Sequence, residues 1–194
     1  MEFRTIVDIP ENMPKISHAD GILLLGSCFS EHIGRQLVDA KFRCDVNPFG
    51  ILYNPQSVLV ALRQLMEGKQ YTESDLFFFN EQYRSYMHHG TFAGDDQAET
   101  MNNINARLRN AHEQFSRNRY ILLTLGTSWV FSLKETGQVV SNCHKQPAGM
   151  FNRTRLSVTD IVDSYAGLIR DIRSLNPTCN ILFTVSPIRH AKDG

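Results

Sequence analysis

The chain has 194 residues, of which 42% are hydrophobic, and its 20 Lys and Arg balance its 20 Asp and Glu to a formal net charge of zero. This neutrality gives no electrostatic reason to expect nucleic acid or an anionic membrane as a partner. No apolar run approaches the length of a membrane span, and the N-terminal stretch MEFRTIVDIPENMP lacks the basic and apolar regions of a signal peptide.

The spacing of the cysteines gives an indication of the cellular compartment. Four of them are scattered through the chain without a CxxC pair, at positions 28, 44, 143 and 179. Because no export signal precedes them, we expect reduced thiols in a cytoplasmic protein. The length and the ordinary content of charged residues indicate a single domain over residues 1–194.

The first clear pattern is a buried strand that runs directly into a helix. Four apolar residues, Ile22 to Leu25, predict the strand, and an amphipathic helix follows from Ser30 to about Lys41. Ser27 lies in the turn between them, where an open α/β sheet binds its ligands and where a helix N-terminus favours an anion. The plainer alternative is that Ser27 or Ser30 only caps the helix.

The remaining elements alternate between strands and helices. We predict, in chain order, a strand at Phe42–Val46, a turn at Asn47–Gly50, a helix at Pro55–Glu67 closed by Gly68, a strand at Gln82–His88 and a helix from Gln97 to about Asn118. There follow a buried strand at Tyr120–Leu125, a β-hairpin of Trp129–Leu133 with Gln138–Asn142, an irregular segment at Cys143–Arg155, a helix from Ser157 to about Leu175 and a buried strand at Asn180–Val185. Continuously apolar strands that alternate with helices indicate a parallel sheet covered on both faces.

Three of the buried strands end in small polar groups, in the sequences LLLGS, LLTLGTS and ILFTVSP. In a parallel sheet these ends share one edge, so Ser27, Thr127 and Ser186 should gather at one crevice beside the Asn47–Gly50 turn. The chain has neither GxGxxG nor GxxxxGK[ST], so the usual phosphate-binding loops are missing.

This set of residues favours acyl transfer. We expect Ser27 to be the nucleophile, with its own N–H, that of Gly50 and a donor from Thr127 as the oxyanion hole. The GxSxG motif of α/β-hydrolases is absent, and no histidine stands at a spacing that marks it as the base. The polar group of a substrate is expected to meet side chains along the crevice, namely Asn47, His89 and His144.

Two other interpretations compete with this one. Cys28 offers a thiol nucleophile, but neighbours on a strand point to opposite faces, so a buried structural cysteine is favoured. His88-His89 and Cys143-His144 have the chemistry of zinc ligands. Adjacent extended residues diverge, however, so at most one of each pair would bind, and we expect neither a metal nor another cofactor.

Several motifs are long enough to compare with known families. They are GSCFS (Gly26–Ser30), VNPFGILYNP (Val46–Pro55), the pair His88-His89, TLGTSWVF (Thr124–Phe131), KETGQVVSNCHKQP (Lys134–Pro147), RLSVTDIV and TVSPIRHAKDG (Thr184–Gly194). Together they resemble the GSCFA family of bacterial proteins over nearly the whole chain. The family is named after a Gly-Ser-Cys-Phe-Ala motif, and this chain has the small Ser30 at its last position.

The GSCFA family is grouped with the SGNH/GDSL-type hydrolases, which are flavodoxin-like α/β/α esterases and lipases. The resemblance therefore implies a three-layer α/β/α fold with a mostly parallel sheet. It also matches Ser27 to the SGNH nucleophile and Gly50 to an oxyanion glycine. Gly126-Thr127 occupies the place of a Gly-x-Asn-Asp block, from which Thr127 departs.

SGNH enzymes take their base from an Asp-x-x-His block near the C-terminus, and this chain has none. We expect that its C-terminal part is missing, together with the base. His190 is the nearest substitute, but a loop histidine directly after a strand favours a structural or substrate-facing role. A sheet without its last covering helix should also expose an apolar face and favour self-association.

The expected function is a serine esterase or deacylase that acts on an acyl or acetyl ester of a small molecule or carbohydrate. An acyltransferase differs only in passing the acyl group to an alcohol other than water. A third possibility is a module that binds a ligand in the same crevice without turning it over. A histidine base would favour the first two, and its absence the third.

Overall fold

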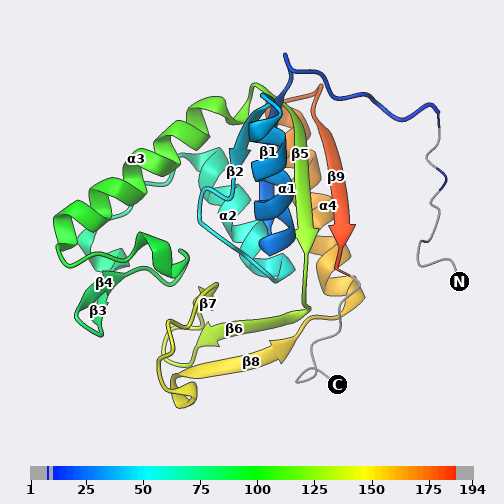
Figure 1. The fold of residues 1–194 in the computed structure, drawn as a ribbon. Coiled ribbons are helices and arrows are strands. Elements are labelled where there is room, and N and C mark those ends of the chain that lie inside the picture. Colours follow the sequence, from blue (N-terminus) through cyan, green and yellow to red (C-terminus); the bar gives the residue numbers. More distant parts are fainter. Residues whose placement is uncertain (1–7, 9–10, 187–194) are drawn as a thin grey trace, which may run out of the picture.

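A computed structural model describes residue 8 and residues 11–186 of the chain (Figure 1). Its centre is a four-stranded parallel sheet in the order β2-β1-β5-β9. The strands are β1 (Gly21–Gly26), β2 (Arg43–Val46), β5 (Asn118–Leu125) and β9 (Asn180–Val185). The three predicted buried strands therefore lie side by side, and all of them run in the same direction.

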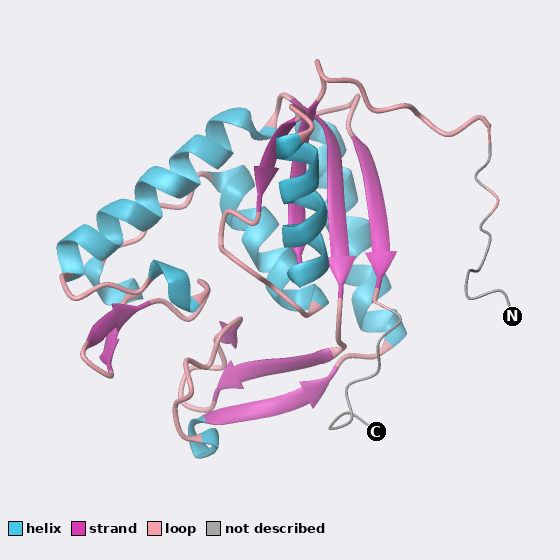
Figure 2. Ribbon diagram, in the orientation of Figure 1, coloured by secondary structure: helices cyan, strands magenta, loops and turns pink. Residues whose placement is uncertain are grey.

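Helices cover both faces of this sheet, which confirms the predicted three-layer α/β architecture (Figures 1 and 2). One face carries α1 (Cys28–Asp39), and the other carries α2 (Pro55–Glu67) and α4 (Val158–Leu175). The longest helix, α3 (Gln97–Phe115), packs against α2. None of the helices in the described residues is both long and apolar enough to cross a membrane.

Strand β1 is buried on both sides because its side chains alternate between two cores. Ile22 and Leu24 pack with the α1 side, and Leu23 and Leu25 pack with α2 and α4. These four side chains are at most 1% exposed, so the strand tolerates no polar residue on either face. This explains the uninterrupted apolar run in the sequence.

The helix ends follow the local chemistry that the sequence predicts. Asn54 caps α2 through its side chain, Pro55 occupies the first turn, and Gly68 closes the helix with φ 65°, a left-handed conformation that glycine adopts without strain. Ser157 and Asp160 form a reciprocal capping box at the start of α4. The predicted bounds of α2 and β9 agree with the structure.

The antiparallel parts are more extensive than predicted. β6 (Trp129–Leu133) pairs with β7 (Val139–Val140) and also with β8 (Phe151–Arg155), within the segment that was expected to be irregular. Only Phe151 of β8 is buried, so the strand has no alternation of apolar and polar residues to reveal it. The β3 (Phe77–Phe79) and β4 (Gln82–Arg84) strands form a separate hairpin, and β4 ends well before His88.

Three short 3-10 helices complete the described elements: η1 (Glu73–Asp75), η2 (Gly90–Phe92) and η3 (Ala148–Met150).

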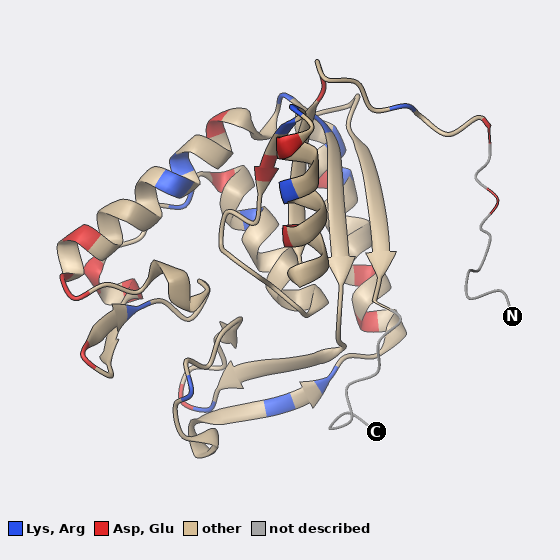
Figure 3. Cartoon of the chain, in the orientation of Figure 1, with Lys and Arg blue, Asp and Glu red and all other residues tan. Residues whose placement is uncertain are grey.

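Strand β9 forms one edge of the central sheet, because β5 is its only partner in the described residues. Leu182 and Val185 are 42% and 75% exposed, and Val158 and Val162 of the adjacent α4 are exposed as well. No charged side chain lies on β9 (Figure 3). Leu182 is in register with Leu122 on the α1 side and Val185 with Leu125 on the α2 and α4 side, so the exposed apolar side chains of β9 lie on both faces of the sheet. A single apolar face and self-association through it stay predictions.

Two glycines inside helices give a matched test of the packing of the layers. A Cβ atom on Gly34 of α1 would lie 2.6 Å from both γ-methyl groups of Val46, whereas one on Gly167 of α4 would meet nothing nearer than 3.9 Å. We expect Gly34→Ala to lower the free energy of unfolding by about 1–3 kcal/mol through overpacking. Gly167→Ala should raise it by about 0.5–1 kcal/mol through helix propensity. Urea unfolding measures both, and shifts in the same direction would contradict the close contact of α1 with β2.

Candidate functional site

Ser27 lies in the turn between β1 and α1, as predicted. It is the N-cap of α1, its Oγ accepts a 3.3 Å hydrogen bond from the backbone N–H of Phe29, and it is 5% exposed. That bond is longer than a well-formed N–H···O bond, so the cap holds the hydroxyl weakly. Ser27 therefore does cap the helix, and Ser30 does not.

Ser30 has a different partner. Its Oγ donates to Thr124 Oγ1 at 2.8 Å, and Thr124 Oγ1 lies 2.8 Å from Thr184 Oγ1, so a chain of hydroxyls joins α1, β5 and β9. Gly26 borders this chain with φ 149°, and a Cβ atom there would lie 2.5 Å from the carbonyl oxygen of Thr124. Glycine is thus required directly before Ser27.

Asn47 ties the turn after β2 to the turn after β1. Its Oδ1 accepts from the backbone N–H of Gly26 at 3.0 Å, and its Nδ2 donates to Glu31 Oε2 at 3.0 Å. The residue is buried and has φ 45°. The structure places Asn47 beside Ser27 as predicted, with its amide used to join the two loops, and its contact with a substrate stays a prediction.

The two residues expected to complete the oxyanion hole already have acceptors within the chain. The N–H of Gly50 donates to the carbonyl oxygen of Asn47 at 2.7 Å, and that of Thr127 donates to Tyr53 O at 3.1 Å. Thr127 Oγ1 in turn accepts from the backbone N–H of Trp129 at 3.2 Å. An oxyanion at this place would have to share these donors, and the role of Gly50 and Thr127 stays a prediction.

Tyr53 lies beside Ser27, and the sequence analysis did not single it out. Its carbonyl oxygen also accepts from the N–H of Gly126 at 2.8 Å. A Cβ atom on Gly126 would lie 3.5 Å from Tyr53 Cδ1 and 3.9 Å from Ser27 Cβ, so Ser27 and the Tyr53 ring flank this glycine. Partial burial and the thiol of Cys28 raise the pKa of the Tyr53 hydroxyl. The sequence offers one signal, an aromatic residue between the Asn47–Gly50 turn and a helix cap.

Cys28 corrects one expectation. It is exposed rather than buried, because it is the first residue of α1 and not part of strand β1, so the alternation argument does not apply to it.

The two histidines of the His88-His89 pair face different surroundings. His89 packs on the Asn47–Gly50 turn: a Cβ atom on Gly50, where φ is 77°, would lie 2.3 Å from His89 Cβ. The His89 N–H also donates to the carbonyl oxygen of Phe49 at 2.9 Å. His88 is completely buried, and its ring stacks on Phe49 at 4.9 Å between centroids. His89 therefore borders the crevice, and His88 supports its wall from within.

His144 is the third member of this group. Its Nε2 lies 2.9 Å from the carbonyl oxygen of Ser85, and its Nδ1 lies 3.5 Å from Arg84 Nη1. Burial lowers the pKa of His144, and the charge of Arg84 lowers it further. The structure thus links His144 to the His89 segment through Arg84, whose Nη1 would lie 3.9 Å from a Cβ atom on Gly90, and neither histidine is a hydrogen-bond partner of Ser27.

The described residues hold no histidine within hydrogen-bond distance of Ser27 Oγ. His190 lies outside the described residues. In the described part of the chain, no group of three or more His, Cys, Asp or Glu side chains is placed to hold a metal ion.

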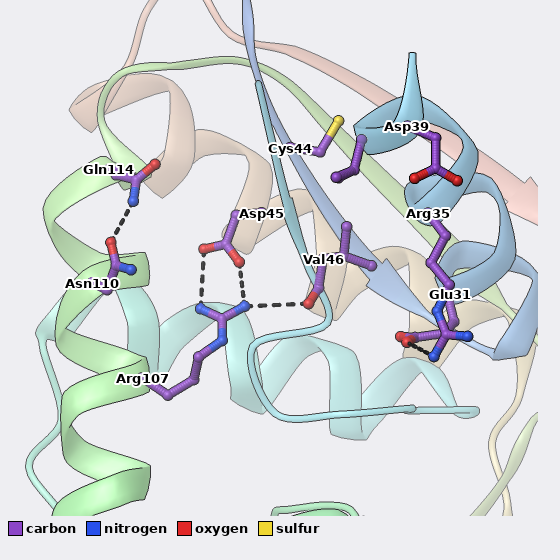
Figure 4. Close-up of a pocket in the computed structure, with 10 residues that line it drawn as sticks. Glu31, Arg35, Asp39, Cys44, Asp45, Val46, Arg107, Asn110 and Gln114 are labelled. Carbon is purple, nitrogen blue, oxygen red and sulfur yellow. Dashed lines mark hydrogen bonds and ion pairs between the residues drawn. The ribbon is translucent and has the colours of Figure 1, made fainter. Parts of the chain in front are cut away.

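A hollow of about 490 Å³ opens at the free edge of β2, between α1 and α3 (Figure 4). Across it, Arg107 of α3 forms an ion pair with Asp45 and donates to the carbonyl oxygen of Val46 at 3.2 Å. Glu31 lines this hollow and binds Arg35 at 3.1 Å with one oxygen, while its other oxygen binds Asn47. A second hollow of about 450 Å³ lies beside Gln82 and the η2 segment. Neither of these two hollows is lined by Ser27.

The hydrogen bonds of the Asn47 side chain should contribute to the stability of the fold. We expect Asn47→Ala to lower the free energy of unfolding by about 2–4 kcal/mol, since it leaves the Gly26 N–H and Glu31 without this partner. Asn80→Ala is the control, because Asn80 also has a positive φ (50°) but is exposed. The control should cost about 1 kcal/mol for the left-handed backbone alone. Equal losses in urea unfolding would mean that the side-chain bonds contribute nothing.

The burial of His88 should make stability depend on pH. Burial, with a smaller effect from His144, lowers its pKa from 6.5 to about 3. Between these two values His88 is protonated in the unfolded chain but not in the folded chain. Its contribution to stability is therefore fully present above about pH 6.5, and the free energy of unfolding falls by up to about 1.4 kcal/mol for each pH unit below that value. Urea unfolding at about pH 7 and about pH 5 should show a smaller loss for His88→Gln than for the wild type. The exposed-site variant His32→Gln should keep the wild-type loss, and an unchanged loss in His88→Gln would refute this assignment.

Comparison with known proteins agrees with this arrangement of motifs. No curated protein and no solved structure matches the chain. The model of the GSCFA family matches residues 21–194, which include every strand and helix described above. The chain therefore belongs to the GSCFA family.

Proposed function

We propose that this GSCFA protein is an SGNH-type serine esterase or deacylase that acts on an acyl or acetyl ester of a small molecule or a carbohydrate. One observation carries the proposal. A weakly capped serine, Ser27, sits at the N-terminus of α1 on the carboxyl edge of the parallel sheet, between the turns that contain Gly50 and Gly126. Catalytic groups of open α/β sheets gather at this edge.

In the proposed reaction, Ser27 Oγ attacks the ester carbonyl and gives its proton to a base. The negative charge that develops on the carbonyl oxygen would be stabilised by the helix N-terminus and by backbone N–H groups of the neighbouring turns. The alcohol leaves with a proton, and water then cleaves the acyl-serine to release the acid. Tyr53 would form the wall beside which the acyl group lies.

A non-catalytic binding module is the second candidate. It is favoured by the absence, in the described residues, of a histidine that contacts Ser27 Oγ and by the acceptors that the Gly50 and Thr127 N–H groups already have. An acyltransferase remains a variant of the first candidate, in which a second alcohol replaces water.

Labelling with a fluorophosphonate probe tests the nucleophile. We expect the 194-residue protein to form one adduct at Ser27, located by mass spectrometry, at a rate that rises with added imidazole, because imidazole supplies a base. Ser27→Ala should lose the adduct. Ser30→Ala, which changes the neighbouring serine but leaves Ser27, should label within about 3-fold of the wild type if the hydroxyl activation belongs to Ser27 alone.

Two results would overturn the esterase. One is labelling that persists in Ser27→Ala, and the other is no labelling of the folded protein even with imidazole, which would favour the binding module. If labelling occurs, release of the acyl group after reaction with p-nitrophenyl acetate separates the remaining candidates. Release accelerated by an added alcohol, with the ester of that alcohol as product, identifies an acyltransferase.

A further inference from the structure

Arg84, at the end of β4, is a partly buried guanidinium without a carboxylate partner. Its Nε donates to the carbonyl oxygen of Phe79 at 3.1 Å, and its Nη2 donates to Gln82 Oε1 at 2.6 Å. Its third contact is the 3.5 Å approach of Nη1 to His144 Nδ1. The ion pairs of the described residues involve Arg35, Arg63, Lys69 and Arg107 as cations, and Arg84 is not among them.

A charge that is partly removed from water without a counter-ion is costly, so such a group often marks the place of an anionic ligand. The nearest carboxylate along this hydrogen-bond path belongs to Asp95, which reaches Arg84 only through the amide of Gln82, at 3.5 Å from Gln82 Nε2. The positive charge of Arg84 therefore remains available.

Arg84 also keeps donors for a ligand. A guanidinium has five N–H groups, and its three contacts use one on each nitrogen, which leaves one on Nη1 and one on Nη2. His144 competes for neither of them. Its Nε2 must carry the proton to donate to the Ser85 carbonyl oxygen, so its Nδ1 is an acceptor for Arg84.

His89 supplies a further donor next to Arg84. Its Nδ1 accepts from the backbone N–H of Thr91 at 3.4 Å and lies 3.2 Å from Thr91 Oγ1, which can donate to it as well. This puts the ring proton on Nε2, which has no hydrogen-bond partner among the described residues. The next residue lies near the guanidinium, since a Cβ atom on Gly90 would lie 3.9 Å from Arg84 Nη1. His89 also contributes to the lowered pKa of His144.

This group adjoins the proposed catalytic crevice. His89 packs directly on Gly50, whose turn is fixed to Asn47, and Asn47 is bonded to the residue before Ser27. A molecule held by Arg84 and His89 would therefore extend along the Asn47–Gly50 turn toward Ser27.

We propose that Arg84 and His89 form an anion-binding subsite, which takes a carboxylate or phosphate group of the molecule bound at Ser27. The planar fork of a guanidinium matches the oxygen pairs of both groups, and the histidine N–H adds a third, directional donor. As a substrate subsite the inference rests on the proposed function, and it narrows the substrate to an ester that carries a negative group. The binding of the anion itself requires no catalysis.

Calorimetric titration with inorganic phosphate and, separately, with acetate tests the subsite at constant ionic strength. We expect saturable binding of at least one anion, which identifies the group as phosphate or carboxylate. Arg84→Gln should weaken it by about 10- to 100-fold, as expected for a lost charge-assisted contact. Arg109→Gln is the matched control, because Arg109 is exposed on α3 and its removal changes the net charge equally. Its affinity should equal that of the wild type.

Nuclear magnetic resonance of the histidine rings keeps the test valid if Arg84→Gln does not fold. On titration of the wild type, the Nε2 resonance of His89 should move with the anion, and that of the exposed His32 should not. No saturable binding of either anion, equal binding by Arg84→Gln, or an unmoved His89 resonance would overturn the subsite.

The Ser27→Ala variant separates this proposal from the esterase. If it binds the anion as tightly as the wild type while fluorophosphonate labelling fails in every variant, the subsite stands and the esterase falls. If Ser27 is labelled but neither anion binds, the esterase stands and the subsite is refuted.

Discussion

The carboxyl edge of the sheet is held together by polar groups of the loops that bond to one another. The backbone of Gly26 is bonded on both sides, by the Asn47 amide to its N–H and by the Leu52 N–H to its carbonyl oxygen at 2.9 Å. Across the crevice, the Tyr53 carbonyl accepts two N–H groups of the β5 loop. The loops after β1, β2 and β5 therefore form one hydrogen-bonded unit. This unit fixes the position of Ser27 more firmly than the weak bond between its hydroxyl and the Phe29 N–H does.

The pair His88-His89 shows how two identical neighbours acquire opposite roles. His88 closes a turn, its N–H donating to the carbonyl oxygen of Ser85 at 3.2 Å, and the backbone becomes extended at His89, so the two side chains point in different directions. His88 enters the core and is kept neutral by burial, while His89 remains at the surface against Gly50. Phe49 stacks on His88, and Gly50 packs against His89. The Asn47–Gly50 turn is therefore held by a buried histidine on its core side and by a second histidine on its surface side.

Local sequence chemistry was a good guide wherever an element is defined by its own residues. Asn54, Pro55 and Gly68 mark the ends of α2 because capping, fixed φ and a left-handed end are properties of single residues. The turn position of Ser27 was predictable for the same reason. Strand β8 was not, since its pairing with β6 is long-range and its residues are mostly exposed. Arg84 and Tyr53 escaped notice because their significance depends on contacts with residues far away in the chain.

The uncharged edge strand β9 also has a consequence for how this protein meets other chains while it folds. Asn180–Val185 is a six-residue segment without charge or proline, the composition that pairs most readily with foreign strands. Pro177 precedes it by three residues and Pro187 follows it by two. A proline cannot donate a ladder hydrogen bond, so a proline on each side of this sequence limits the length over which a foreign strand could pair with it. The stretch open to such pairing is therefore about as long as one short strand.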